Sequence, residues 1–199
     1  MRLFVLARHA ESVLNHERRI NGDPTVPTPL TEHGREQATL LGLQIRELPL
    51  DLCVHTRFGR TVETAKIALG HRDVPLAEEP LLDDVRIGEL EGQTIDDYRA
   101  WKRVHRRADR FPGGESLDET AARYGEGFRR LLARETECCL VVCHEIPIRY
   151  ALNAAGGSDD VDAPVHDVPN ATAILFGEET LVRAADRLVS ELSGTRSPS

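Results

Sequence analysis

The chain of 199 residues lacks any apolar run close to the ~20 residues that a membrane-spanning helix needs. Its first apolar stretch, Leu3 to Leu6, is too short for the apolar region of a signal peptide. The chain also lacks a basic excess, because its formal net charge is −8. A molecule of this charge does not attract nucleic acid or an anionic membrane as a whole. These absences predict a cytoplasmic protein whose partners include neither nucleic acid nor membranes.

Cysteine is scarce, and its spacing matches no metal or haem pattern. The four cysteines lie in or beside apolar runs typical of strands: Cys53, Cys138, Cys139 and Cys143. No pair has the Cys-x-x-Cys spacing. His144-Glu145 begins like the HExxH motif of zinc proteases, but position 148 is Ile, which removes the second ligand. We therefore expect reduced structural thiols, no metal and no other cofactor.

What is present is one domain of moderate size. With 40% hydrophobic and 29% charged residues, the chain can bury one core but is too short for two ordinary domains. Apolar runs of strand length alternate with segments of helical period. Strands are predicted at 3–6, 52–54, 74–76 and 138–142, with a closing hairpin of 173–176 and 181–184. Helices are predicted after Thr31 and Thr56, at 94–110, from Ser116 to about 135, and at 147–154.

This alternation predicts the α/β class, as a three-layer α/β/α sandwich around a mostly parallel sheet. We expect the domain to span residues 1–192, with a small helical flap at roughly 85–113 over the strand ends. Residues 193–199 form a polar tail, for which we expect disorder.

Two of the predicted strands end at a histidine. Leu3 to Leu6 leads to Arg8-His9, and Leu140 to Val142 leads to Cys143-His144. Because ligands bind at the carboxyl ends of strands in α/β sheets, both imidazoles are expected in one crevice. With arginine beside them, they indicate a site for a transferable anionic group, and phosphate is the best candidate.

Phosphoryl transfer through an enzyme needs three kinds of group. A neutral imidazole can attack phosphorus, and His9 is the natural nucleophile. Cations must bind the non-bridging oxygens, and Arg8 is joined by a second arginine from the turn Thr56 to Arg60. An acid must protonate the leaving oxygen. Positive surroundings lower the pKa of His9, which keeps the imidazole neutral and nucleophilic.

The order of short motifs gives each of them weight. They are Arg8-His9-Ala10-Glu11-Ser12 with Asn15, Arg19-Ile20-Asn21-Gly22, Pro29-Leu30-Thr31 through Gly34 to Gln37-Ala38, Arg60-Thr61-Val62-Glu63-Thr64-Ala65, Leu82-Asp83-Asp84 to Gly88 with Glu91-Gly92, Phe111 to Ser116, and His144. In this order the chain resembles the histidine phosphatase superfamily, also called phosphoglycerate-mutase-like. The resemblance runs from residue 3 to about residue 176.

The resemblance implies that His9 is phosphorylated and that Arg8, Arg60 and His144 bind the phosphoryl oxygens, with Arg60 selected over Arg57. It further implies that Asn15 and the Glu145 backbone amide assist. We also expect Asn21, Gly22, the flap and Glu145 to face the rest of the substrate. The proton donor falls at Asp84, where relatives usually carry Glu, and Asp83 is the alternative. Glu145 stands where relatives usually carry Gly. Its carboxylate would repel phosphate, pair with an arginine such as Arg149, or select a cationic substrate group.

The function expected from these residues is a metal-independent phosphomonoester hydrolase acting on a small phosphorylated substrate. One alternative is a phosphoglycerate-type mutase, although only residues 93–111 separate the Glu91-Gly92 and Phe111–Ser116 landmarks, where mutases generally carry a longer insertion. The other is a phosphate-binding module without turnover. The basic run 102–107 is interpreted as the solvated face of a helix, and Trp101 as a residue that packs the flap down.

Overall fold

A five-stranded sheet forms the centre of the computed structural model, which describes residues 2–190. The strand order is β3 (Leu76–Glu78), β2 (Leu52–His55), β4 (Cys138–Cys143), β1 (Leu3–Arg8) and β5 (Ile174–Gly177). The first four strands are parallel, and β5 is antiparallel to β1 at one edge. The predicted mostly parallel sheet is therefore confirmed. The polar tail 193–199 lies outside the described residues.

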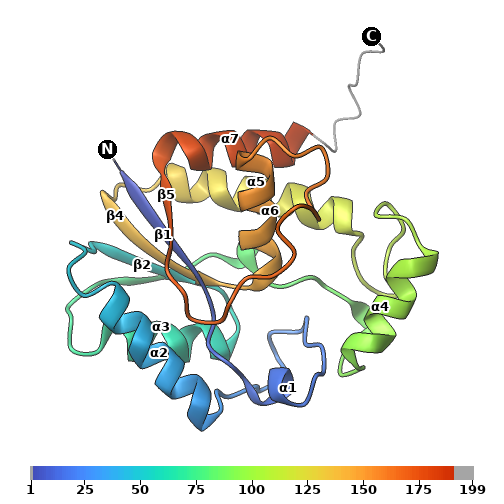
Figure 1. Ribbon diagram of the computed structural model, residues 1–199, viewed down its shortest axis with the longest axis horizontal. Coiled ribbons are helices and arrows are strands. Elements are labelled where there is room, and N and C mark those ends of the chain that lie inside the picture. The colour runs from blue at the N-terminus through green and yellow to red at the C-terminus, as the bar shows by residue number, and fades with distance from the viewer. Residues whose placement is uncertain (1, 191–199) are drawn as a thin grey trace.

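Helices cover both faces of the sheet (Figure 1). On one face lie α2 (Glu32–Gln44) and α3 (Gly59–Leu69), and on the other lie α5 (Leu117–Leu132), α6 (Glu145–Ala155) and α7 (Glu178–Ser190). This arrangement confirms the predicted three-layer α/β/α sandwich. The short α1 (Val13–His16), two 3-10 turns (Pro80–Leu82 and Gly88–Leu90) and α4 (Ile95–Val104) complete the described elements.

Strand β4 joins two apolar cores through alternation of its side chains. Every residue of β4 is buried. Cys139, Val141 and Cys143 pack into the core under α5, α6 and α7. Cys138, Leu140 and Val142 pack into the core under α2 and α3. Because successive side chains of a strand point to opposite faces, a strand buried on both faces reads as a continuous apolar run.

The cysteines take part in this core as the sequence predicts. All four are free and buried. Burial raises the pKa of the Cys53 and Cys143 thiols to about 12, so both stay protonated at neutral pH. Among residues 2–190, no helix has the length and apolar character that a membrane crossing requires.

The predicted closing hairpin is wrong in its second half. Residues 174–177 do form a strand, but Leu181 to Ala184 belong to α7. The buried residues of α7 are Leu181, Ala184, Ala185 and Leu188, which follow the i, i+3, i+4, i+7 spacing of a helix. Their packing against α5 and α6 decides the conformation of a segment that, taken as four residues, fits either element.

The flap helix is shorter than predicted, and the third strand is shifted. Instead of reaching residue 110, α4 ends at Val104, and His105 has extended backbone angles. The Arg106 backbone N–H donates to the Asp109 carboxylate at 2.8 Å, a local bond that replaces a helical one. Strand β3 occupies 76–78 rather than 74–76. Trp101 packs on Phe111 with ring centroids 4.2 Å apart and against the apolar cluster that includes Leu117 of α5.

Candidate active site

The ends of two neighbouring strands bring the two predicted histidines together. Strands β1 and β4 pair in parallel with Arg8 opposite Cys143, so His9 and His144 leave the sheet side by side. Their ring centroids lie 5.3 Å apart at an interplanar angle of 67°. Both side chains are buried, with His9 2% exposed and His144 fully enclosed. Residues 135 positions apart in sequence thus form one structural unit.

The contacts of His9 fix its tautomer. Nδ1 lies 2.8 Å from the Ala10 carbonyl oxygen, which can only accept, so Nδ1 carries the proton. Arg60 Nε donates to His9 Nε2 at 3.0 Å, so Nε2 presents its lone pair. Burial and the charges of Arg60 and Arg8 lower the pKa of His9 well below its ordinary value. His9 is therefore a neutral imidazole with an unprotonated Nε2.

Arg60 is the hub of the site. It lies in the first turn of α3 and is 3% exposed. Its guanidinium donates to the Asn21 side-chain oxygen, to the Asn21 carbonyl at 3.1 Å and to Asp84 Oδ2 at 3.0 Å. It also lies 3.2 Å from His144 Nδ1. Arg57, the other arginine of this turn, pairs instead with Asp83 at 2.6 Å. The structure therefore places Arg60, and not Arg57, between the histidines.

His144 is held from a third strand end. Its Nε2 lies 2.9 Å from the Thr56 hydroxyl, directly after β2, and its Nδ1 lies 3.3 Å from Asp84 Oδ2. Burial lowers the pKa of His144 well below its ordinary value, and burial raises the pKa of Asp84. Both shifts favour a neutral imidazole beside a protonated carboxyl group.

The two adjacent aspartates have different surroundings. Asp84 contacts Arg60 and His144, lines the pocket and keeps a quarter of its side chain exposed. Asp83 is 2% exposed and accepts both the Arg57 backbone N–H at 3.0 Å and the Arg57 guanidinium. Of the two candidates for the proton donor, Asp84 is the one that the structure brings to the histidines.

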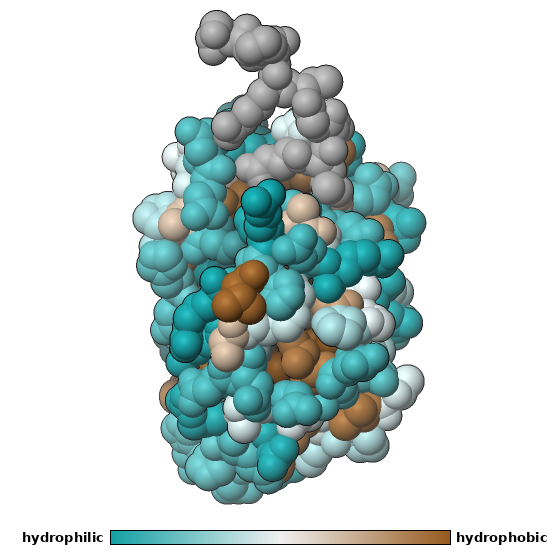
Figure 2. All heavy atoms as spheres, turned by 90° about the vertical axis from the view of Figure 1, so that its right-hand side faces the viewer, coloured by the Kyte–Doolittle hydropathy of each residue, from teal (hydrophilic) through white to brown (hydrophobic). Residues whose placement is uncertain are grey.

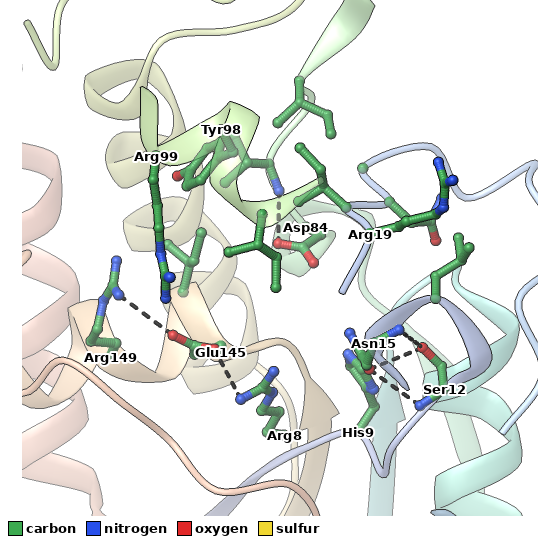
Figure 3. Close-up of a pocket in the computed structure, with 18 of the residues that line it drawn as sticks. Arg8, His9, Ser12, Asn15, Arg19, Asp84, Tyr98, Arg99, Glu145 and Arg149 are labelled. Carbon is green, nitrogen blue, oxygen red and sulfur yellow. Dashed lines mark hydrogen bonds and ion pairs between the residues drawn. The ribbon is translucent and has the colours of Figure 1, made fainter. Parts of the chain in front are cut away.

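These groups stand at the inner end of a pocket of about 560 Å³. In Figure 3, Arg8 and His9 lie on one side, Asp84 lies opposite them, and Tyr98 and Arg99 descend from α4. Asn15 lines the pocket while its side chain also closes the capping box of α1 with Ser12. Asn15 therefore has the turn role that its residue type suggests and a place in the pocket wall.

Asn21 and Gly22 line the pocket, and Glu91 holds both of them. The sequence identifies Glu91 only as part of the Glu91-Gly92 motif. Glu91 accepts from the Asn21 amide and from the Gly22 backbone N–H, each at 2.7 Å. A Cβ at Gly22 would lie 2.0 Å from the Val85 carbonyl oxygen, so only glycine fits there. The sequence predicts Thr56 only as the start of a turn. Its place directly after a predicted strand is the signal that could have placed it beside His144.

Glu145 pairs with two arginines. Its carboxylate lies 2.9 Å from Arg8 Nη1 and 3.5 Å from Arg149 Nη1 (Figure 3). Arg8 Nη1 also donates to the Val168 carbonyl at 2.8 Å. Burial raises the pKa of Glu145. Of the three roles considered for this carboxylate, pairing with arginine is the one present in the structure, and Arg8 is the shorter contact.

No group of three or more histidine, cysteine or acidic side chains within residues 2–190 has the arrangement of a metal site. The positive charge around His9 comes from arginine side chains instead.

The structure thus combines a mostly parallel α/β sheet with two histidines and an arginine at adjoining strand ends. The family model described as histidine phosphatase superfamily (branch 1) matches residues 4–180. The chain belongs to this superfamily, as its motifs predicted.

Relatives and solved structures carry different activities in their names. The 2,3-bisphosphoglycerate-dependent phosphoglycerate mutase 2 of Gloeobacter violaceus is 34% identical over 167 residues, covering 76% of this chain and 74% of that protein. The alpha-ribazole phosphatase of Shigella flexneri has a TM-score of 0.76 at 24% identity, covering 87% and 89%. The mycobacterial glucosyl-3-phosphoglycerate phosphatase, in complex with VO3, has a TM-score of 0.73 at 24% identity, covering 88% and 92%. At these identities the two structures show the shared fold.

Proposed function

We propose that this protein is a phosphomonoester hydrolase that acts on a small phosphorylated substrate through a phosphohistidine at His9. The observation that carries the proposal is the unprotonated Nε2 of His9, which borders the pocket beside Arg60. A nucleophile needs a free lone pair, and a phosphoryl dianion needs adjacent guanidinium groups.

The steps follow from the groups at the inner end of the pocket. His9 Nε2 attacks phosphorus while the bond from phosphorus to the ester oxygen breaks. The leaving oxygen takes a proton from Asp84, whose raised pKa suits this role. Water then attacks the phosphohistidine and gives its proton to the Asp84 carboxylate. Inorganic phosphate leaves, and His9 and Asp84 return to their starting states.

Arg60, Arg8 and His144 hold the phosphoryl oxygens in this scheme. In support of this, the Arg60 guanidinium contacts both His9 Nε2 and His144 Nδ1, so all three groups lie around one point at His9. Asn15 and the Glu145 backbone amide, the first of α6, complete the set of donors. Helix N-termini favour anions because their backbone N–H groups are unpaired. Since arginine supplies the charge, a metal chelator is expected to leave the rate unchanged, and strong inhibition would contradict the scheme.

A phosphoglycerate-type mutase is the second candidate, and the 34% identity to a protein of that name favours it. Hydrolysis requires that water reaches the phosphohistidine. Asp84 is a quarter exposed, and only residues 93–111 separate the Glu91-Gly92 and Phe111–Ser116 landmarks, where mutases generally carry a longer insertion, which favours hydrolysis. The phosphatases among the structural neighbours are consistent with that choice.

The test measures inorganic phosphate release from a panel of metabolite phosphates and 4-nitrophenyl phosphate, beside interconversion of 2- and 3-phosphoglycerate. Release in the unmutated protein, lost in His9→Ala, is the expected result. Interconversion faster than release would establish the mutase. Binding of phosphate esters without either reaction would leave the third reading, a binding module.

A further inference from the structure

The outer part of the pocket has a composition that the catalytic scheme does not require. Beyond the histidines, its walls carry apolar side chains: Ile20, Val85, Ile87, Ile95, Tyr98 and Ile146. They come from four separate segments, including α4 and α6. We call this part, together with the charged residues beside it, the outer chamber. Figure 2 shows the face of the molecule that carries α4, where apolar side chains lie in gaps between polar ones.

The pocket is large for a three-carbon phosphate. Its volume of about 560 Å³ lies within the 300–1,000 Å³ typical of sites that enclose drug-sized ligands. A phosphoryl group on a three-carbon acid fills only the inner end and leaves the apolar walls against water. Apolar walls gain free energy when an apolar ligand displaces that water. The outer chamber therefore fits an alcohol with a bulky apolar body.

The charge of the lining exceeds what one phosphoryl group neutralises. Seven basic side chains line the pocket (Arg8, Arg19, Arg60, Arg99, Lys102, Arg103 and Arg149), against the acids Asp84 and Glu145. This excess occurs in a chain of net charge −8. A phosphoryl dianion balances two of these charges, so a positive surplus stays in the outer chamber.

The surplus lies on α4. Glu145 balances Arg8 at 2.9 Å, and Asp162 balances Arg149 at 2.9 Å and lies 3.8 Å from Lys102. Arg19 lies 3.7 Å from Glu17. Arg99 has only an exposed contact with Asp96 at 3.5 Å, and Arg103 has no acidic partner within 4 Å among residues 2–190. In Figure 3, Arg99 extends from α4 toward Glu145 and Arg149, across the pocket from His9.

We propose that the outer chamber binds a phosphomonoester whose alcohol has a bulky apolar body and an anionic group at its far end. The apolar body packs between Ile95 and Tyr98 of α4 and Ile146 of α6, and Arg99 and Arg103 bind the distal carboxylate or phosphate. This inference rests on the proposed function, because the phosphoryl group at His9 fixes the other end of the same ligand.

The test uses phosphonates, which keep the phosphoryl charge but have a carbon–phosphorus bond that is not hydrolysed. Calorimetry compares methylphosphonate, (2-naphthyl)methylphosphonate and (6-carboxy-2-naphthyl)methylphosphonate on the unmutated protein. The naphthyl group is expected to lower Kd at least about tenfold by apolar burial. The carboxylate is expected to lower Kd at least about threefold further, and salt should weaken that second gain. Equal Kd values for either successive pair overturn the proposal.

Matched variants on one helix assign the two gains. Ile95→Ser is expected to remove most of the naphthyl gain, whereas Val104→Ser, at a site 78% exposed and outside the lining, leaves it. The double change Arg99→Gln with Arg103→Gln is expected to remove the carboxylate gain, whereas Arg106→Gln, also outside the lining, leaves it. Gains that survive the pocket variants, or that fall equally in the controls, overturn the assignment.

Binding and turnover separate the two proposals. Graded binding of the phosphonates without hydrolysis of any phosphate ester supports the outer chamber and contradicts the hydrolase. Hydrolysis of phosphate esters at a rate that does not depend on the apolar body, with equal inhibition by the three phosphonates, supports the hydrolase and overturns the proposal for the outer chamber.

Discussion

His9 and His55 occupy similar positions in the sheet and have different surroundings. His55 is the last residue of β2 and His9 follows β1, and each Nδ1 lies 2.8 Å from the carbonyl oxygen of the next residue. Only His9 receives Arg60 on Nε2 and lines the pocket. A strand end therefore delivers an imidazole to the edge of the sheet, but the contacts beyond it differ. Under the proposed function, burial and the Arg60 guanidinium are what make His9 the reactive imidazole of the two.

The largest expected effect comes from replacing His9, with the replacement of His55 as its matched control. His9→Ala should lower kcat on 4-nitrophenyl phosphate by about 10⁴-fold or more, because the nucleophile is lost. His55→Ala should keep kcat within about twofold of the unmutated protein, since His55 does not line the pocket. Steady-state phosphate release measures both. Comparable losses in the two variants would mean that position at the strand end, and not the His9 contacts, decides reactivity.

The two arginines of the Thr56–Arg60 turn sharpen the same comparison. Arg60→Lys should lower kcat/KM by about 10²–10³-fold, because a lysine cannot reach His9, Asn21 and Asp84 at once. Arg57→Lys should cost less than about threefold, since Arg57 is half-exposed and pairs with Asp83. Thermal melts of both variants test whether the fold is kept. A larger loss from Arg57→Lys would contradict the placement of Arg60 at the phosphoryl group.

The adjacent aspartates provide a third pair. Asp84→Asn should lower kcat by about 10²-fold on an alkyl phosphate, whose leaving oxygen needs a proton. The loss should be much smaller on 4-nitrophenyl phosphate, because its leaving group, 4-nitrophenolate, departs without taking a proton. Asp83→Asn should keep the activity within a few-fold on both substrates, because Asp83 contacts Arg57 and not the pocket. The opposite ranking would assign the acid to Asp83.

The pH profile gives this third pair an independent readout. The neutral form of His9 is present above its lowered pKa, so the rate on an alkyl phosphate falls on the acid side as His9 becomes protonated. The acid form of Asp84 is present below its raised pKa, so the rate falls on the alkaline side as Asp84 ionises. Asp84→Asn should remove the alkaline limb and keep the acid limb. An unchanged alkaline limb would place the acid elsewhere.

The smallest expected effect is at the edge of the inner site. Glu145→Gln removes a charge that competes with the substrate for Arg8, so KM should fall by about two- to fivefold while kcat changes by less than about twofold. Glu178→Gln, which breaks the remote pair with Arg2, should change neither constant. A rise in KM for Glu145→Gln would show that the carboxylate orients Arg8 for binding instead of competing for it.

The sequence predicted the parts of the fold that are governed by burial on both faces. Strands β1 and β4 appear as unbroken apolar runs, and capping residues mark the starts of α2 and α5. The prediction of the second half of the hairpin was wrong, because the four residues from Leu181 to Ala184 are too few to distinguish the two-residue period of a strand from the 3.6-residue period of a helix. The predicted end of α4 was wrong, because the Asp109 side chain accepts the Arg106 backbone N–H in place of a helical hydrogen bond.

The site could be predicted where motif and strand end coincide. His9, Arg60, Asp84 and His144 fall together in the structure as their order along the chain implied. What pairs with Glu145 could not be settled, because Arg8 and Arg149 reach it from different elements. Thr56 was missed because its contact with His144 joins β2 to β4, and strand order is not visible in one sequence.

Glu91 connects the contacts around Arg60 with the segment that leads into α4. By gripping Asn21 and Gly22 just before the chain departs into α4, it anchors the Arg60 network to the body of the protein. We therefore expect changes beyond residue 93, which alter α4, to leave the contact between Asn21 and Arg60 in place. A single carboxylate thus joins the segment that leads into α4 to the residues that hold Arg60.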